Sequence, residues 1–343
     1  MDNIRLSICI PTYNFGKFIG QTLDSILPQL STEVEVIILD GGSTDETFDE
    51  VTVRQNDYAQ LTYCQQGFRG GIDRDIEKAV SLAQGKYCWL FSADDVMLPG
   101  SVNKVLDAIK SNYDIYLCEH VLCTLDMQPM RVHPPFNKMR HSRLFNLGDA
   151  LQKKEYFCLA CTSEAFFSFL SGPIFKKEIW DAAINIPESF RNSCWIVAAH
   201  LLSMIPRGIT LYYLNEVLIH KRGDNDSFMD NGMVNRYAIA INGFRQLSET
   251  IFGYDSLEAF HIRRSVCNDL SLKHLLNLKI DCIDRKLRED QLALNRLVMV
   301  HYSDPTLINQ LNLLVYKIMP MRLYRYMKIL KKTLKKRYVN GEY

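Results

Sequence analysis

The chain has 343 residues, of which 47% are hydrophobic and 23% charged, with a formal net charge of +1 at pH 7. These values are ordinary for a globular protein, and they exclude a disordered, collagen-like or disulfide-stapled chain. The near balance of charge argues against a protein that binds nucleic acid with its whole surface. At about 150 residues per domain, we expect two domains.

The cysteines and the N-terminus indicate the compartment. Cys9 and Cys88 lie in apolar, strand-like runs, and the ten cysteines are irregularly spaced. Cys158 and Cys161 form a close pair without a second pair or a nearby histidine cluster, so zinc is weakly supported. There is no signal-peptide pattern, and no apolar stretch approaches the roughly 20 residues of a membrane span. We expect free thiols in a cytoplasmic protein.

Strand and helix patterns alternate over the first 120 residues. The predicted strands are 4–10, 34–39, 61–64, 87–91 and 114–118, and the predicted helices are 17–30, 44–55, 72–83 and 100–111. Ser43 to Glu46 reads as a capping box for the second helix. The alternation predicts βαβ units and a mainly parallel sheet.

The remainder of the chain changes character twice. Residues 122–144 contain Pro129, Pro134 and Pro135 and show no clear period, which predicts a loop-rich crossing. An irregular α/β stretch follows at 172–228, with a helix near 194–204 and a strand at 210–214. After Asp230 the apolar spacing of three and four residues predicts helices to the end.

Each of the first four predicted strands is followed by small or polar residues. These segments are Pro11-Thr12-Tyr13-Asn14, Asp40-Gly41-Gly42-Ser43-Thr44-Asp45, Gly67-Phe68-Arg69-Gly70-Gly71-Ile72-Asp73-Arg74 and Ser92-Ala93-Asp94-Asp95. One such segment is usually only a turn, but the ends of parallel strands share one edge, where ligands bind. The four together predict a nucleotide site.

The side chains at this edge suit a nucleoside diphosphate. Asp40 can accept a hydrogen bond from a pyrimidine base, and Arg74 can support the diphosphate. Asp94 and Asp95 follow an apolar strand, where their oxygens can hold Mg²⁺ or Mn²⁺ against the diphosphate. The alternative is that Asp94 and Asp95 cap the helix that begins near Pro99.

These segments resemble those of the family 2 glycosyltransferases with the GT-A fold, in the opening PTYN, the D-G-G-S-T-D segment and the carboxylates after the fourth strand. The resemblance covers about residues 4–228. It implies an α/β, Rossmann-like nucleotide-sugar-binding sheet in a domain of residues 1–228. The donor half would be about 1–120 and the acceptor half about 121–228, followed by a mainly helical region at 229–343.

Residues 79–91 and 222–228 are further similar to the abequosyltransferases of bacterial O-antigen and lipopolysaccharide synthesis. This implies transfer of a sugar, such as the 3,6-dideoxyhexose abequose, from a nucleoside-diphosphate donor that is expected to be CDP-linked. The implied acceptor is a polyprenyl-diphosphate-linked oligosaccharide.

The resemblance also implies roles for individual residues. Donor contacts would come from Pro11, Thr12, Tyr13, Asn14, Asp40, Gly71, Asp73, Arg74, Ala93 and Arg222. Asp94 would be the principal metal ligand, Asp95 a metal ligand or catalytic sugar contact, and Asp224 a further metal candidate.

Three positions depart from the family pattern. Ser92 replaces the first acid of the metal motif, and Gly41 follows Asp40 where a second Asp is common. Ser193-Cys194 stands where relatives carry a catalytic Glu-Asp pair, and neither side chain is a plausible general base without activation. Glu164 is the candidate base, with an exposed helix acid as its alternative. A retaining enzyme would need no such base.

Two other functions are compatible with a nucleotide-binding sheet. A sugar nucleotidyltransferase would share the sheet, although it would ordinarily have a glycine-rich basic loop after the first strand. A non-catalytic nucleotide-sugar-binding relative would explain the missing acidic pair. A Rossmann dehydrogenase is disfavoured because no G-x-G-x-x-G opens the first helix. His120 and His220, each ending a strand-like run, are expected to be structural.

The C-terminal region carries concentrated positive charge. Residues 317–338 hold nine basic residues and no acid, and Leu323, Tyr326, Met327, Leu330 and Leu334 recur at helical spacing. A basic amphipathic helix of this kind binds an anionic membrane surface, which predicts a peripheral protein on the cytoplasmic face of the inner membrane. The alternative is packing on its own domain or on a second subunit of a homo-oligomer.

Overall fold

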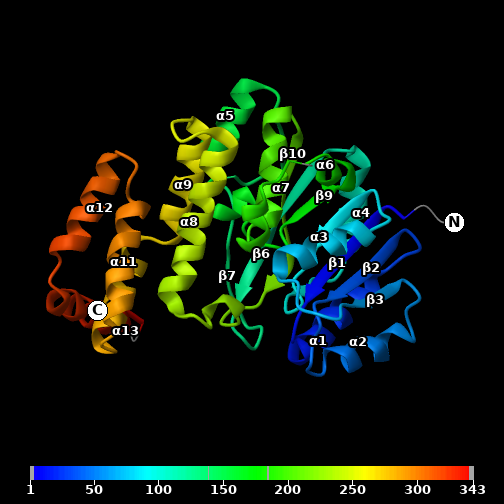
Figure 1. The fold of residues 1–343 in the computed structure, drawn as a ribbon, viewed down its shortest axis with the longest axis horizontal. Helices are drawn as coiled ribbons and strands as arrows, with labels where there is room; N and C mark the ends of the chain where they lie inside the picture. The colour runs from blue at the N-terminus through cyan, green and yellow to red at the C-terminus, as the bar shows by residue number, and fades with distance from the viewer. Residues whose placement is uncertain (1–3, 138, 184, 340–343) are drawn as a thin grey trace. The chain divides into compact units, whose positions relative to one another are not determined.

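The computed structural model describes residues 4–137, 139–183 and 185–339, with side chains up to residue 330. Its first strands form the parallel part of the sheet, and Figure 1 shows them in blue and cyan with their helices. The strands are β1 (Leu6–Thr12), β2 (Val34–Asp40), β3 (Leu61–Gln65) and β4 (Tyr87–Leu90). The helices are α1 (Gly16–Ile26), α2 (Thr47–Gln55), α3 (Ile72–Leu82) and α4 (Ser101–Ala108). The predicted alternation is confirmed here.

The second half of the sheet is mixed rather than parallel. Its strands are β5 (Val96–Met97), β6 (Ile115–Cys123), β7 (Pro129–Val132), β8 (Arg143–Asn146), β9 (Pro173–Lys176) and β10 (Thr210–Lys221). The strand order is β3-β2-β1-β4-β9-β6-β10-β5, with β7 on β6 and β8 on β10. Because β9 runs antiparallel to both β4 and β6, the expectation of a mainly parallel sheet holds only for β1 to β4. Helices α5 (Ala150–Leu159), α6 (Lys177–Ala182) and α7 (Ile196–Met204) connect these strands.

The central strands are buried on both faces. Every residue of β1, β2 and β4 is buried, which explains their nearly continuous apolar sequences. Glu35 is one of two acids in β2, and its Oε1 accepts hydrogen bonds from the Ser7 hydroxyl at 2.6 Å and the Gln84 backbone amide at 2.7 Å. These hydrogen bonds help to offset the cost of burying the acid.

The predicted capping box is wrong. Helix α2 begins at Thr47, and no side chain caps it at Glu46. The Ser43 hydroxyl donates to Asp40 Oδ1 at 2.7 Å instead, and Asp45 Oδ1 accepts from the Thr47 amide at 3.1 Å. The carboxylates of Asp40 and Asp45 are stronger acceptors than a hydroxyl, so residues 43–46 stay a turn that is bound to the sheet edge.

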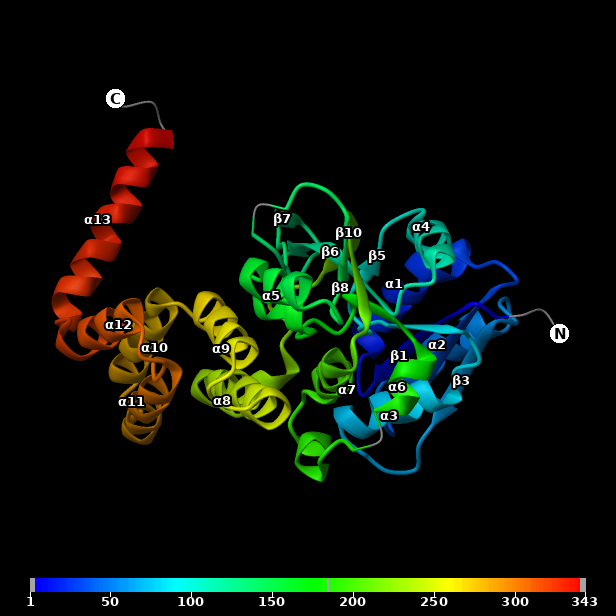
Figure 2. The same cartoon turned by 90° about the horizontal axis from the view of Figure 1, so that it is seen from above.

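The chain after β10 is helical, as the spacing predicts. The helices are α8 (Gly232–Phe252), α9 (Leu257–Asp269), α10 (Leu272–Asp284), α11 (Arg288–His301), α12 (Leu307–Ile318) and α13 (Met321–Val339). Contacts divide the chain into two units: residues up to 227 with 243–266, and residues 228–242 with those from 267 onward. We call the second the helical unit. Figure 2 shows its helices in yellow to red.

The helical unit has its own core and one exposed apolar face. Leu275, Leu276, Leu294 and Val298 of α10 and α11 are buried in that core. On α12, by contrast, the apolar side chains at positions 307, 311, 314 and 318 are half or more exposed. Their spacing of four, three and four residues places them on one side of the helix.

The structure also bears on the cysteines and on membrane-spanning helices. All ten cysteines are free thiols. Within the described residues, no helix has both the length and the apolar character that crossing a membrane demands.

Candidate active site

The ends of β1 to β4 lie at one edge of the sheet, as predicted. Thr12 pairs with Asp40, and Asp40 pairs with Gln65, so three strand ends lie side by side in register. The Phe91 amide donates to the Cys9 carbonyl at 2.9 Å, which aligns the end of β4 with the same edge. Among the described residues, the buried Thr12 Oγ1 has no hydrogen-bond partner. A buried hydroxyl without a partner at this edge is suited to a ligand.

Asp40 organises the loop that follows β2. Its side chain is fully buried, and Oδ1 accepts from the Ser43 amide and the Ser43 hydroxyl, each at 2.7 Å. Oδ2 accepts from the Tyr63 hydroxyl at 2.5 Å, and burial, aided by Asp40, raises the pKa of Tyr63. Reading of a base by Asp40 stays a prediction, and it requires one of these hydrogen bonds to be exchanged.

The neighbouring loops are tied together at Tyr13 and Asn14. The Asn14 side-chain oxygen accepts from the Thr44 amide at 2.9 Å, and the Asn14 amide donates to the Ser43 hydroxyl at 2.8 Å. The Arg69 guanidinium lies 4.2 Å from the ring centroid of Tyr13. Arg69 therefore belongs to this edge, although no role was assigned to it from the sequence. Pro11 is buried at the end of β1.

Asp73 and Arg74 hold α3 against the region before α7. Asp73 Oδ2 accepts from the Cys194 amide at 2.8 Å and Oδ1 from the Ile196 amide at 3.1 Å, so Asp73 caps the start of α7. Burial raises the pKa of Asp73. Arg74 is half-exposed and pairs with Glu188 at 3.2 Å. Gly71 precedes α3 with a φ of 91°, which favours glycine. The donor contacts assigned to these three residues stay predictions.

Asp75 explains why glycine follows Asp40. A Cβ added at Gly41 would lie 2.7 Å from Asp75 Oδ2, closer than real Cβ contacts come. Asp75 is buried, Gln66 Nε2 donates to its Oδ1 at 2.6 Å, and burial raises the pKa of Asp75. The carboxylate of Asp75 thus fills the space that a side chain at position 41, beside Asp40, would occupy. No sequence pattern singled out Asp75, which lies in the first turn of α3.

The turn after β4 is fixed mainly through Asp95. Its Oδ2 accepts from the Ser171 hydroxyl at 2.8 Å and its Oδ1 from the Arg222 amide at 3.0 Å. Burial, followed by the charge of Asp94, raises the pKa of Asp95 to about 7. The Ala93 carbonyl, on the same turn, accepts from the Thr22 hydroxyl at 2.9 Å.

The Arg222 side chain braces this turn. Its guanidinium donates to the carbonyls of Asp94 at 2.8 Å and Leu125 at 2.5 Å, and to the side-chain oxygen of Gln21 at 2.6 Å. The sequence assigned Arg222 to donor contact, whereas in the structure its nitrogens are directed to protein oxygens. Donor contact by Arg222 stays a prediction.

Asp94 is oriented by two neutral donors. The Ser92 hydroxyl donates to Oδ1 at 2.6 Å and the Asn225 amide to Oδ2 at 2.7 Å. Asn225, which the sequence reasoning missed, occupies the place expected for Asp224. Asp224 itself is exposed, with a φ of 56°. Ser92, which stands in place of an acid, keeps contact with the metal motif through its hydroxyl.

The pair Asp94 and Asp95 fits a divalent cation that is held jointly with a ligand's phosphates. Burial and then the charge of Asp94 raise the pKa of Asp95, and a bound cation would favour its ionised form. Oδ1 of Asp94 accepts from Ser92 and Oδ2 accepts from Asn225, and each oxygen retains lone-pair capacity. The described ranges contain no group of three or more His, Cys, Asp or Glu side chains placed to hold a metal on their own. Mg²⁺ commonly binds through one or two carboxylates plus phosphate oxygens.

Glu164 lies in a buried cluster with two histidines and a lysine. Its carboxylate oxygens are 3.5 Å from His120 Nδ1, 3.8 Å from His133 Nε2 and 3.6 Å from Lys221 Nζ. Burial, then Lys221, lowers the pKa of His120 to about 2 and that of His133 to about 4, so both rings are neutral near pH 7. Lys221 is therefore the cation beside Glu164. The alternative of an exposed helix acid is wrong, because Glu164 is buried.

The segment Ser193-Cys194, where the resemblance led us to expect an acidic pair, is a capped turn. Cys194 adopts a φ of 69°, a left-handed conformation, and its amide is held by Asp73. The Ser193 hydroxyl donates to the Phe190 carbonyl at 2.8 Å. Neither side chain is placed as an acid–base pair.

The chain is similar to known glycosyltransferases. The model for "Glycosyl transferase family 2" matches residues 7–170. Abequosyltransferase RfbV of Salmonella typhimurium is 31% identical over 252 residues, which cover 72% of this chain and 75% of RfbV. Chondroitin synthase of Escherichia coli is 32% identical over 110 residues, 32% of this chain and 16% of that enzyme.

Solved structures share the fold at lower identity. Staphylococcus aureus TarS 1–349 in complex with UDP-GlcNAc aligns with a TM-score of 0.62 and 17% identity, over 98% of this chain and 92% of TarS. The mannosyltransferase PcManGT of Pyrobaculum calidifontis, in complex with GDP-Man and Mn²⁺, aligns with a TM-score of 0.54 and 13% identity, over 98% and 87% of the two chains. These alignments show a common fold, a mixed α/β sheet followed by helices.

Proposed function

We propose that the edge formed by the ends of β1 to β4 binds the nucleotide-sugar donor, because this chain belongs to glycosyltransferase family 2. The membership rests on the family match and on the relative of 31% identity. The chain is a nucleotide-sugar-dependent glycosyltransferase with a GT-A-like sheet and C-terminal helices, so the family, the fold class and the enzyme class expected from the sequence are confirmed. The nucleotidyltransferase and the non-catalytic relative are set aside.

The finer proposal concerns the substrates. The donor would be a CDP-linked 3,6-dideoxyhexose such as abequose, and the acceptor a polyprenyl-diphosphate-linked O-antigen oligosaccharide. The support is the similarity to the abequosyltransferase RfbV, three quarters of whose length aligns with this chain. At the edge itself, Tyr13 with the overlying Arg69 offers a flat surface beside Asp40 for a base, and the unpartnered Thr12 hydroxyl offers a polar contact.

We propose that Mg²⁺ or Mn²⁺ assists, with Asp94 as its protein ligand. The cation would supply Lewis-acid stabilisation of the departing nucleoside diphosphate. Ser92 and Asn225 hold the Asp94 carboxylate in one orientation, and Arg222 holds the backbone carbonyl of Asp94. PcManGT was solved with Mn²⁺, which supports the choice of metal. Asp95 would contribute its charge from behind Asp94.

Of the two catalytic candidates, the contacts favour Glu164 over Asp95. Both oxygens of Asp95 accept hydrogen bonds from Ser171 and the Arg222 backbone, which suits a positioning residue. Glu164 lies beside Lys221, whose charge favours the ionised form that a general base requires. We therefore propose that Glu164 accepts the proton of the acceptor hydroxyl.

We further propose that α12 and α13 bind an anionic membrane surface on the cytoplasmic side. The exposed apolar stripe of α12 supports this, together with the exposed Leu323, Met327 and Leu330 of α13. In α13 the structure describes the basic side chains of Arg322, Arg325 and Lys328. The sequence argument also relied on four lysines whose side chains lie outside the described part of the chain, namely Lys331, Lys332, Lys335 and Lys336. Apolar burial and lysine or arginine charges together favour the interface.

The test begins with the donor. Thermal unfolding is followed with CDP-, UDP-, GDP- and dTDP-sugars, with and without Mn²⁺, because a true donor stabilises the native state by mass action. We expect one nucleotide to stand out and to depend on Mn²⁺.

Asp94→Ala is expected to abolish transfer and the Mn²⁺-dependent part of the shift while the unliganded protein unfolds normally. The exposed Asp126→Ala serves as the matched control. Near-normal turnover by Asp94→Ala, or wild-type activity unaffected by EDTA, would contradict the metal role.

A further inference from the structure

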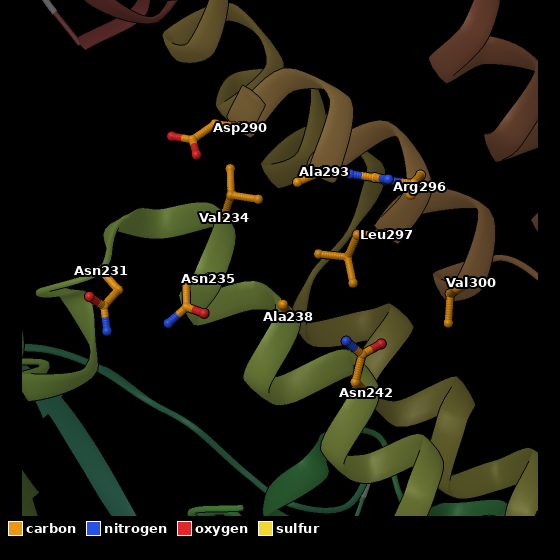
Figure 3. A pocket seen from close by; sticks show the side chains of 10 residues that line it. All are labelled: Asn231, Val234, Asn235, Ala238, Asn242, Asp290, Ala293, Arg296, Leu297 and Val300. Atoms are coloured by element: carbon orange, nitrogen blue, oxygen red, sulfur yellow. The ribbon is translucent and has the colours of Figure 1, made fainter. Parts of the chain in front are cut away.

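A second binding site is suggested by two adjoining cavities of the helical unit. One has a volume of about 370 Å³ and lies between α8 and α11, and the other, of about 740 Å³, shares Asn231, Val234 and Asp290 with it. Both volumes fall within the range of roughly 300–1,000 Å³ that is common for small-molecule sites. We call the smaller one, drawn in Figure 3, the carboxamide groove.

The polar walls of the groove come from two facing helices. Asn231, just before α8, and Asn235 and Asn242 of α8 line one side, and Asp290 and Arg296 line the other from α11 (Figure 3). The interval of seven residues between Asn235 and Asn242 places these two on one face of α8. In the described part of the chain, none of these five side chains makes a hydrogen bond or an ion pair with another residue. Their polar groups are therefore available to a ligand.

Apolar residues line the rest of the groove. Val234 and Leu297 are buried, and Ala238 and Ala293 bring only methyl groups to the space between the helices. Small side chains at these facing positions leave room that larger ones would fill. The groove thus combines apolar surface with separated hydrogen-bonding groups, which is the composition of a specific ligand site.

The polar and charged side chains that line the two cavities indicate which class of ligand would bind. Each carboxamide offers a donor and an acceptor, as do the hydroxyl groups of a sugar. The groove has one acid and one base, and the adjoining cavity is lined by Asp230, Asp281 and Asp290 against Arg285 and His274. Such a lining disfavours phosphates and other anions. The adjoining Tyr237 adds a half-buried ring against which a sugar can pack.

We propose that the carboxamide groove binds a neutral oligosaccharide, and that it holds part of the acceptor glycan. The second clause rests on the proposed function, while the first stands on the groove alone. Asn235 and Asn242 would bind sugar hydroxyls from α8, and Arg296 would donate to ring or hydroxyl oxygens from α11. The groove would add acceptor affinity without taking part in the transfer step.

The experiment measures binding of neutral tetrasaccharides of hexoses and 6-deoxyhexoses to the full chain. An array identifies the best binder, calorimetry gives its dissociation constant, and inorganic phosphate is the anionic comparison. Asn235→Ala and Arg296→Ala are each expected to weaken binding about tenfold, the effect of losing one good hydrogen bond. Arg288→Ala, on the same helix but outside both cavities, is the matched control and should bind normally. Alanine suits exposed helix positions, so the variants should fold.

Donor hydrolysis is measured on the same proteins to separate the two ideas. We expect Asn235→Ala and Arg296→Ala to hydrolyse donor normally. Tetrasaccharide binding that is lost in both variants but kept in Arg288→Ala supports the groove, even if the wild type hydrolyses no nucleotide sugar and the proposed function fails. Absence of tetrasaccharide binding in a wild type that hydrolyses donor overturns the groove alone. Unchanged affinity in both variants, or displacement of the sugar by phosphate, overturns it as well.

Discussion

Substituting Gly41 tests whether Asp75 fills the space beside Asp40. A Cβ at position 41 would lie 2.7 Å from Asp75 Oδ2, a contact that real structures do not tolerate without movement. The carboxylate cannot move freely, because it is buried and Gln66 holds its other oxygen at 2.6 Å. Overpacking of this kind costs about 1–3 kcal/mol, so Gly41→Ala should lower the free energy of unfolding by that amount. The φ at Gly41 is not positive, so backbone strain adds nothing.

The double variant makes the argument quantitative. In Gly41→Ala/Asp75→Ala the colliding carboxylate is gone, so the alanine should then cost little. Urea unfolding of the wild type, the two single variants and the double variant gives a coupling free energy, which we expect to favour the double variant by about 1–2 kcal/mol. Gly70→Ala is a useful comparison, since its Cβ would lie 3.0 Å from the other oxygen of Asp75 and should give a smaller coupling. Additive effects within about 0.5 kcal/mol would refute the steric reasoning.

Three further predictions follow from other parts of the chain. Asp40→Ala should raise KM more than it lowers kcat, because the proposed base contact is remote from the reacting carbon; steady-state kinetics with an unchanged KM and a much lower kcat would contradict it. Deletion of residues 320–343 should reduce sedimentation with anionic liposomes at low salt, and undiminished binding by the truncated protein would exclude a membrane role for α13. Burial lowers the pKa of His301 to about 4. The stability linked to its neutral form is therefore present above its ordinary pKa of 6.5 and is lost as the pH falls towards 4. The urea midpoint of His301→Gln should fall less over that pH range than that of the wild type, and parallel profiles would refute the assignment.

The sequence predicted the sheet edge formed by the ends of β1 to β4 well, because the signals for it are local. Continuous apolar runs predicted β1, β2 and β4, which are buried on both faces, and the polar turns after them lie together as parallel pairing requires. The long β10 was predicted only as 210–214. Its continuation to Lys221 depends on pairing with β6 across a break near Val217, which no local pattern reveals.

The residues and roles that the sequence did not indicate depend on partners distant in the chain. Asn225 contacts Asp94 from 131 positions away, and Asp73, which was expected to contact the donor, caps α7 from 121 positions away. Asp75 is one of several acids on α3, and its importance depends on the empty space over Gly41. Such roles arise from how the loops meet in three dimensions, so residue type and spacing could not assign them.

The cap that Asp73 places on α7 has a consequence for redesign of this enzyme. Its carboxylate already accepts from the amides of Cys194 and Ile196, and burial raises its pKa. Installing a Glu-Asp pair at Ser193 and Cys194 would set new acids next to a buried acid, where like charges destabilise one another. A variant that carries such a pair is therefore expected to need a neutral residue at position 73 in the same protein.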